Sequence, residues 1–552
     1  MKPVLLYLPS NEILMSFPIS RKYYLWLALP LLLLVAFICK NHQSQSEAKG
    51  TGNYLSNPAN NAPFRDMLGV NAFEWNLLQN PVDPNNTMVV YEPKMKVLEG
   101  FAGMRHYLDW GRIEGSKGKY TFAPAHNGGW NYDAMYQRCK EANIDVLADL
   151  KTCPDWLLET YPKDMRDAEN VPAPYGSDRK QPASYILQAK AAFQFAARYG
   201  SNKKVSPSLI SVDTSPRWTA DPLNQPKAAL NLVKYIECDN ERDKWWKGDK
   251  AKQSAEEYAA NMSAFYDGDK GKLGKNVGVK NADPNMKVVM GGLASADVAY
   301  VEKMIEWCKL HRGHRANGSV DLCFDVINYH LYANDHKQQS SNNATVGVAP
   351  ELTEAPALAR AFVVLGNKYH LPIWVTEAGY DVNQQSPQRA IPVGNKSALI
   401  TQADWLLRTA LLYEREGIKK LFFYELYDDN LQNAMQYASC GLVTNDLKRR
   451  PAADYILQAR TLLGNYSYQK TIGNNPIVDL YKYGQKSIYV LTVPDQKGRT
   501  ATYTLHLPGT RHVIMHTPQV GADKMTDQLR PVIKGQLTIE ATETPVFVEI
   551  KD

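Results

Sequence analysis

The sequence predicts an α/β fold: a (β/α)8 TIM barrel with a C-terminal antiparallel β-sandwich domain. Between residues 64 and 460, short apolar runs alternate with longer amphipathic stretches, a rhythm typical of βα units around a parallel sheet. Eight strands, the number that closes a barrel, are predicted at 67–71, 104–108, 145–150, 233–240, 287–291, 325–328, 373–377 and 420–424. After residue 463 the pattern changes to alternating strands separated by Gly, Pro and Asp turns.

Helical periodicity lies between the predicted strands. Apolar residues recur every three or four positions, for example over 132–142 and 398–416. In the C-terminal region, alternation predicts strands at 487–493, 502–507, 512–516 and 536–539. We therefore assign the barrel to residues 64–463 and the sandwich, as an accessory domain, to residues 464–552.

The N-terminal segment predicts export. Arg21 and Lys22 precede an uninterrupted apolar stretch from Tyr23 to Cys39. Its length suits either a cleaved signal peptide or an uncleaved membrane anchor, with lipidation of Cys39 as a third, weaker alternative. Residues 42–63 are rich in Asn, Ser, Gln and Gly and predict a flexible linker. Residues 1–63 thus form a signal or anchor plus linker, and the expected location is extracellular, periplasmic or at the cell surface.

Composition narrows the possible partners and cofactors. The formal charge of +6 arises from 63 basic and 57 acidic residues mixed along the chain, which is too weak a bias to indicate nucleic-acid binding. The six cysteines after Cys39 show no CxxC spacing, so no structural zinc site is expected, although an exported protein could pair some of them. No cluster of histidines predicts a metal, and no cofactor is expected. The sequence predicts no particular oligomeric state.

Two glutamates mark the candidate site. Glu241 follows the fourth predicted strand and Glu377 ends the seventh. Barrels of this kind place reactive groups at the carboxyl ends of their strands, so the two side chains are expected to meet. Two carboxyl groups about 5 to 5.5 Å apart are what cleavage of a glycosidic bond with retained configuration requires. We assign Glu377 as the nucleophile and Glu241 as the general acid/base.

Longer motifs extend this pattern to a family resemblance. The segment 236–243, which contains Asn240-Glu241, resembles the Asn-Glu-Pro signature on strand four of the clan A retaining glycoside hydrolases, and Trp374-Val375-Thr376-Glu377 resembles their strand-seven segment. The likeness runs from Phe64 onwards, through Arg105, the turn 154–156, the segment 328–332 and the segment 440–443. The family within the clan is undetermined. Two departures are Arg242, where Pro is usual, and the end of strand eight, Phe423-Tyr424-Glu425, where many members have Trp.

The resemblance implies a retaining glycoside hydrolase that cleaves β-linked glycosidic bonds in a polysaccharide or oligosaccharide. It also implies that Arg105 keeps Glu377 ionised and that Tyr424 takes the place of the usual Trp platform. From their positions along the strands, His330 or Tyr332 could bond the nucleophile and Asn240 could bond a sugar hydroxyl. Stacking on sugar rings is expected after strands three and four, at Trp156, Trp245 and Trp246. Glu425 either binds hydroxyls or faces the helices. Arg105 could instead form a rim ion pair, and His330, Tyr332 and one of Trp245 and Trp246 could belong to the core.

Two other functions use the same residues. A transglycosylase would form the same covalent intermediate and pass the sugar to a hydroxyl acceptor. A non-catalytic polysaccharide-binding protein of the cell surface would keep the aromatic side chains but would need only one of the two carboxylates. The expected partner is a carbohydrate in every case, with the membrane as a further contact of the N-terminal segment.

Overall fold

The computed structural model describes residues 62–219, 221–336 and 343–551. The chain divides into two compact units, residues 1–55 and 56–552, and every described residue belongs to the second. The predicted signal or anchor at 23–39 and nearly all of the predicted linker lie outside the described residues. Within the described part, no helix has both the length and the apolar character needed to cross a membrane.

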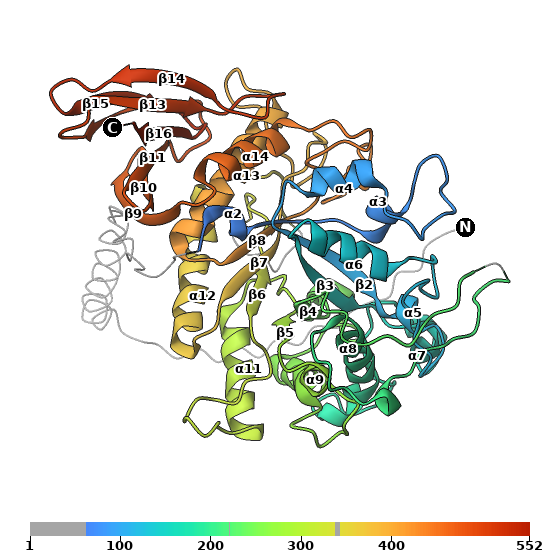
Figure 1. The fold of residues 1–552 in the computed structure, drawn as a ribbon. Coiled ribbons are helices and arrows are strands. Elements are labelled where there is room, and N and C mark those ends of the chain that lie inside the picture. Colours follow the sequence, from blue (N-terminus) through green and yellow to red (C-terminus); the bar gives the residue numbers. More distant parts are fainter. Residues whose placement is uncertain (1–61, 220, 337–342, 552) are drawn as a thin grey trace, which may run out of the picture. The chain divides into compact units, whose positions relative to one another are not determined.

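Eight parallel strands form the barrel (Figure 1). They are β1 Leu68–Asn71, β2 Gly103–Asp109, β3 Asp145–Lys151, β4 Tyr235–Cys238, β5 Lys287–Met290, β6 Ile327–His330, β7 Ile373–Ala378 and β8 Lys420–Phe423. Their order is β5-β4-β3-β2-β1-β8-β7-β6, and parallel bridges Val289–Val326 and Leu293–Tyr329 join the two ends of that series. The predicted barrel is confirmed, with strand boundaries that differ from the predicted ones by at most two residues.

Helices connect the strands. They are α2 Phe64–Met67, α3 Glu74–Leu78, α4 Glu92–Leu98, α5 Trp110–Ile113, α6 Tyr132–Glu141, α7 Asp155–Leu158, α8 Ile186–Tyr199, α9 Ala255–Asp267, α10 Val279–Ala282, α11 Val298–His311, α12 Ala355–Tyr369, α13 Ala398–Glu416 and α14 Pro451–Leu463. Short 3-10 helices lie at Lys163–Met165, Pro182–Tyr185, Pro207–Leu209, Trp245–Lys247 and Pro350–Leu352. The helix α13 has the predicted bounds because Ser397 caps its first turn and Gly417, at φ 95°, ends it.

Side chains inside the barrel are arranged in layers because alternate residues of each strand point inward. An apolar layer lies near the amino ends of the strands; its members are Leu147, Val289, Val326, Trp374 and Phe422. Gly69 makes room for this layer, since a Cβ atom there would lie 2.5 Å from the ring of Phe422. Two residues further along the strands, the same inward positions become polar, as at Asp149, Glu237, Asn328, Thr376 and Tyr424. The strands thus lead from an apolar layer to a polar one at their carboxyl ends.

The C-terminal region is an antiparallel sandwich, as predicted. Its strands are β9 Ser467–Asn474, β10 Ile477–Tyr483, β11 Lys486–Thr492, β12 Ala501–His506, β13 His512–Thr517, β14 Thr526–Pro531, β15 Gln536–Ala541 and β16 Val546–Ile550. Six form one sheet, and β12 pairs with β15 in a second. Val478, Leu505 and Leu537 belong to the apolar cluster between the two sheets. The first sheet contacts α13 through a buried ion pair, in which Arg415 Nη2 lies 2.6 Å from Asp479 Oδ2.

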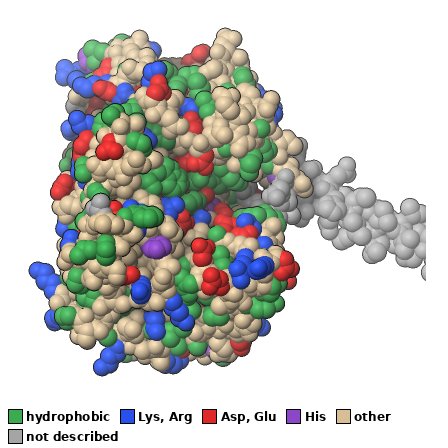
Figure 2. Space-filling view, turned by 90° about the vertical axis from the view of Figure 1, so that its right-hand side faces the viewer, with side chains coloured by type: hydrophobic (Ala, Val, Ile, Leu, Met, Phe, Trp, Pro, Cys, Tyr) green, Lys and Arg blue, Asp and Glu red, His purple; other side chains and the backbone are tan. Residues whose placement is uncertain are grey.

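Charged side chains of both signs are interspersed on the face shown in Figure 2, which carries no large patch of a single sign. This distribution follows the mixed order of basic and acidic residues in the sequence. The six cysteines of the described part are buried and free. Cys308 and Cys323 come nearest to pairing, with their sulfur atoms 3.5 Å apart.

Candidate active site

Glu377 lies in β7 and is 5% exposed. Its Oε1 accepts hydrogen bonds from Arg105 Nη1 and from the Tyr107 hydroxyl, both at 2.7 Å, and its Oε2 accepts one from the Tyr332 hydroxyl at 2.8 Å. Burial would raise the pKa of Glu377, but the charges of His330 and Arg105 and the two hydroxyl donors outweigh it and lower the pKa to about 2. The carboxylate is therefore held ionised in a fixed position.

A β-bulge sets the direction of this side chain. Tyr329 of β6 pairs with Val375, whereas the next residue, His330, pairs with Glu377, so β7 carries one extra residue. Thr376 and Glu377 consequently both point into the barrel: the hydroxyl of Thr376 contacts Asn328 and His330, and Glu377 contacts Arg105. Regular alternation would have turned one of these two neighbours outward.

Glu241 lies three residues beyond β4, in a turn where its φ is 52°. Its amide donates to the carbonyl of Gly292 at 3.1 Å, which ties the turn to the segment after β5. Its Oε1 lies 2.8 Å from Nδ1 of His330. One oxygen of Glu241, one nitrogen of His330 and one oxygen of Glu377 all lie within 4.8 Å of one another. The two glutamates thus converge at the carboxyl end of the barrel.

His330, the last residue of β6, sits between the two glutamates. Its Nδ1 lies 2.8 Å from Glu241 and 3.6 Å from Glu377 Oε2, and its Nε2 lies 3.0 Å from the Thr376 hydroxyl. Burial lowers the pKa of His330, but the charge of Glu377 and the hydrogen bond to Glu241 more than compensate and raise it. A protonated His330 can therefore stabilise negative charge on either carboxylate.

Arg105 in β2 is fully buried, and all three of its guanidinium nitrogens are bonded. Nε donates to Glu237 at 2.7 Å, Nη1 to Asn71 and Glu377, and Nη2 to Asp149 at 3.1 Å and Asn240 at 2.8 Å. Burial and the charge of Glu237 raise the pKa of Asp149 well above its usual range. This network fixes the guanidinium beneath Glu377 and also orients the side chain of Asn240.

A cavity of about 410 Å³ opens onto these groups. Among the predicted residues it is lined by Asn240, Glu241, His330, Tyr332, Glu377 and Tyr424. Trp245 and Trp246 also line it, with their rings nearly perpendicular and 4.8 Å apart. The lining combines aromatic faces with converging polar groups, which is how proteins hold sugar rings.

Two predicted residues lie elsewhere. Trp156 is directed away from the cavity: its Nε1 donates to the carbonyl of Glu114 at 2.9 Å, and its ring packs edge-on against Trp110. Glu425 is 1% exposed and accepts a hydrogen bond from the amide of Asp429 at 3.1 Å. Burial and the charges of Asp429 and Asp428 raise the pKa of Glu425 well above its usual range. Neither side chain lines the cavity.

The sequence reasoning missed several members of the site. Tyr107 follows Arg105 by two positions in β2, and alternation along that strand was a signal that could have identified it. Alternation along β3 likewise links Asp149 with Lys151, and Lys151 lines the cavity. Tyr437 carries no such signal, because it comes from the loop between β8 and α14, where its φ is 74°. Its ring lies 4.2 Å from that of Tyr332.

Three of these groups could also ligate a metal ion: Glu241, His330 and Glu377. Both nitrogens of His330 and both oxygens of Glu377 already lie within hydrogen-bonding distance of protein partners. A metal ion would have to displace several of these bonds. Hydrogen bonding among the side chains accounts for the arrangement without one.

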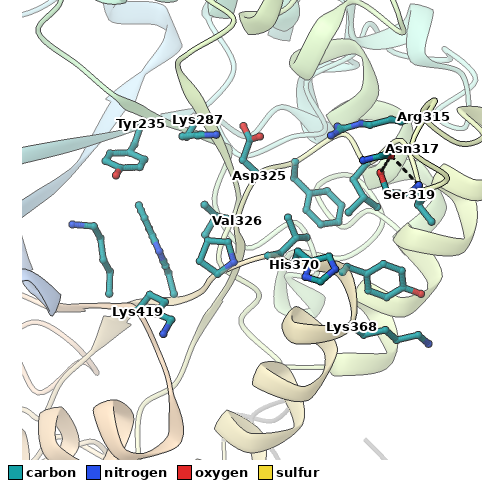
Figure 3. A pocket seen from close by; sticks show the side chains of 18 of the residues that line it. Tyr235, Lys287, Arg315, Asn317, Ser319, Asp325, Val326, Lys368, His370 and Lys419 are labelled. Carbon is teal, nitrogen blue, oxygen red and sulfur yellow. Dashed lines mark hydrogen bonds between the residues drawn. The ribbon is translucent and has the colours of Figure 1, made fainter. Parts of the chain in front are cut away.

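A second cavity, of about 1000 Å³, lies at the opposite end of the barrel, against the amino ends of β4 to β8 (Figure 3). It is lined by Lys287 of β5, by Lys368 and His370 at the end of α12, and by Lys419 just before β8. Its lining includes one carboxylate, Asp325, whose Oδ2 accepts from the amide of Val288 and lies 2.8 Å from Lys280 Nζ. This larger cavity lacks the facing carboxylates of the smaller one.

No protein-family model and no curated protein sequence matches the chain. Solved structures match its fold. A family 39 glycoside hydrolase from the gut symbiont Bacteroides cellulosilyticus WH2 has a TM-score of 0.58 and 16% identity, over 88% of this chain and 82% of that chain. A glucosidase from Croceicoccus marinus has a TM-score of 0.51 and 13% identity, over 89% of this chain and 97% of that chain. A family 30 endoxylanase from Clostridium papyrosolvens C71 has a TM-score of 0.50 and 12% identity, over 89% of this chain and 97% of that chain. The chain therefore shares its fold with these three enzymes, as the sequence resemblance predicted.

Proposed function

We propose that this protein is an exported glycoside hydrolase that cleaves β-linked glycosidic bonds with retention of configuration. One observation carries the proposal: an oxygen of Glu241 and an oxygen of Glu377 lie within 4.8 Å of each other at the rim of the barrel. Retaining enzymes hold their two carboxyl groups about 5 to 5.5 Å apart, whereas inverting enzymes need about 6.5 to 9.5 Å to admit a water molecule. The short separation favours the retaining reaction.

Glu377 acts as the nucleophile in this mechanism. Its lowered pKa keeps it ionised, and three donors hold its oxygens in place. When Glu377 attacks the anomeric carbon, its negative charge is consumed in the new ester bond. Arg105 remains neutralised by Glu237 at 2.7 Å, so the guanidinium is not left without a counter-charge. The network can therefore serve both the free and the glycosylated enzyme.

Glu241 acts as the general acid and then as the general base. In the first step it gives a proton to the departing glycosidic oxygen, and in the second it takes a proton from water. Its contact with His330 at 2.8 Å stabilises the carboxylate that exists between the two steps. Asn240, whose Oδ1 accepts from Arg105, is positioned to donate its side-chain amide to a sugar hydroxyl.

The substrate class is a β-linked oligosaccharide or polysaccharide. The aromatic side chains around the cavity, including Tyr332, Tyr424, Trp245 and Trp246, support the binding of sugar rings. Two of the fold neighbours, a glucosidase and an endoxylanase, agree with this class. Arg21, Lys22 and the apolar stretch 23–39 that follows them support export.

Product stereochemistry tests the proposal directly. The purified protein is offered a panel of aryl β-glycosides and β-linked polysaccharides, and the first-formed anomer is identified by NMR. We expect the β-anomer first, together with covalent labelling of Glu377 by a slow-turnover 2-fluoro glycoside, located by peptide mass spectrometry. An α-anomer formed first, or a label on another residue, would overturn the mechanism.

A further inference from the structure

A group of lysines lies beside the candidate active site, and one of them, Lys151, lines its cavity. Lys151 is the last residue of β3, and its side chain is 10% exposed. Its ammonium lies 3.9 Å from the ring centroid of Tyr107, whose hydroxyl bonds Glu377 at 2.7 Å. A positive charge thus lies one side chain away from the proposed nucleophile. The proposed double displacement gives this lysine no step to perform.

In this group, lysines outnumber the carboxylates with which they form ion pairs. Glu169, which also lines the cavity, lies 3.9 Å from Lys151, 3.6 Å from Lys244 and 3.3 Å from Lys247. The neighbouring Asp167 lies 3.0 Å from Lys247 and 3.6 Å from Lys250. Four ammonium groups therefore share two carboxylates. We call these six residues, Lys151, Asp167, Glu169, Lys244, Lys247 and Lys250, the lysine wall.

The two innermost lysines lack strong partners. Within the described residues, the ammonium groups of Lys151 and Lys244 have no hydrogen-bond acceptor and reach Glu169 only at ion-pair distance. The side chain of Lys244 is 1% exposed, and burial lowers its pKa to about 8. An ammonium group has three donors, so Lys151, which lines the cavity, can bind a second anion besides Glu169.

We propose that the lysine wall binds an anionic substituent on the sugar held in the cavity, with Lys151 as the residue that contacts it. The inference rests on the proposed function and deepens it: the substrate is an acidic carbohydrate that bears either a carboxylate, as in a uronic acid, or a sulfate ester. Both groups accept charge-assisted hydrogen bonds from ammonium donors. Glu169 holds the lysines in place and competes with the ligand for them.

Binding is measured by calorimetry on the full chain carrying Glu377→Gln, which prevents turnover. The probes are two matched pairs: a uronate-bearing β-linked oligosaccharide with its carboxyl-reduced counterpart, and a sulfated oligosaccharide with its desulfated counterpart. We expect one acidic member to bind roughly tenfold to hundredfold more tightly than its neutral partner, as a charged hydrogen bond provides. Added salt should weaken the acidic member alone. The pair that shows the preference identifies carboxylate or sulfate.

Two substitutions of opposite sign isolate the contact. Lys151→Met should remove the preference for the acidic member and leave the neutral member within about threefold, since the methionine keeps the apolar stem over Tyr107. Glu169→Gln should strengthen binding of the acidic member, because it removes the competing carboxylate. Melting temperatures serve as a folding control. If Lys151→Met does not fold, Glu169→Gln and the salt dependence of the parent still decide the question.

The outcomes separate this inference from the proposed function. The inference is wrong if the acidic and neutral members of each pair bind equally well to the Glu377→Gln protein, or if Lys151→Met weakens both members alike. This holds even where neutral substrates are hydrolysed with retention. If an acidic ligand binds in a Lys151-dependent manner but the parent cleaves no substrate, the lysine wall stands and the proposed function fails.

Discussion

The two ends of the barrel carry their charges in opposite ways. At the carboxyl end, Arg105 is fully buried and bonds Glu237, Glu377 and Asp149. At the amino end, Lys287 is exposed at the start of β5, on the edge of the larger cavity (Figure 3). The cavity at the carboxyl end has less than half the volume of the other. The smaller cavity, not the larger one, thus adjoins the buried and mutually bonded charges to which we assign the proposed reaction.

The physical reason lies in the cost of burial. A buried ion loses several kcal/mol of hydration, and only well-placed partners offset that loss. A sequence that buries Arg105, Glu237 and Glu377 together therefore holds them in one geometry, and such preorganised groups stabilise charge that develops in a reaction. Exposed lysines at the amino end face no such constraint, since water solvates them.

The largest effect expected from this comparison is that of Glu377→Ala. Removing the proposed nucleophile should reduce kcat by roughly 10⁴-fold or more, because no other group can form the covalent intermediate. The measurement is turnover of an aryl β-glycoside. Sodium azide can enter the space left by the side chain, and the glycosyl azide it forms should have inverted configuration. Activity within about tenfold of the parent would remove Glu377 from the mechanism.

Glu241→Ala should have the next largest effect. Loss of a general acid costs roughly 10²-fold to 10⁴-fold, and the loss should be greatest for substrates with poor leaving groups. On an activated aryl glycoside the first step survives, so azide should restore turnover and yield a product of retained configuration. The opposite stereochemistry of the two azide products distinguishes the roles of Glu241 and Glu377. An inverted product from this variant would contradict our assignment.

A smaller effect is expected from Tyr332→Phe, which removes one hydrogen bond to Glu377. The Tyr332 hydroxyl helps to lower the pKa of Glu377 to about 2, so its loss should raise that pKa toward the ordinary value of 4.5. The acid limb of the kcat/KM profile should then move to higher pH, with roughly a tenfold loss of rate at the optimum. Tyr437→Phe is the matched control, because it removes from the same cavity a phenol hydroxyl that forms no hydrogen bond to Glu377 among the described residues. An unshifted acid limb would contradict this account.

Much of this site was predictable because strand ends in a barrel share one rim. Glu241 and Glu377 were predicted from their positions at the ends of apolar runs, and Arg105 and His330 from segments of the family resemblance; the roles of all four stay predictions. Trp156 was expected beside the sugar, but a position in a turn does not fix the direction of a side chain, and the structure shows its indole bonded to the carbonyl of Glu114. The β-bulge at Thr376 and Glu377 also left no pattern in the sequence, since it arises from the pairing of β7 with β6.

The same limits on sequence-based prediction apply to the strands of the sandwich. The strand β15 alternates between buried and exposed residues, and β11 and β13 were predicted to within one residue at each end. The edge strand β14, Thr526–Pro531, was missed because it is polar and largely exposed, so it shows no apolar alternation. Its strand geometry comes from pairing with β13. An exposed edge strand such as β14 is thus defined by its neighbour rather than by a pattern of its own.

The smallest effect is expected at the amino end of the barrel, and it tests the comparison most directly. Lys287→Ala should leave kcat/KM within about twofold and the free energy of unfolding within about 0.5 kcal/mol, because an exposed lysine without a partner among the described residues contributes little. Turnover of the aryl glycoside and urea unfolding measure both. A loss of activity above tenfold would mean that the two ends of the barrel are coupled, and buried charge alone would then not locate the function.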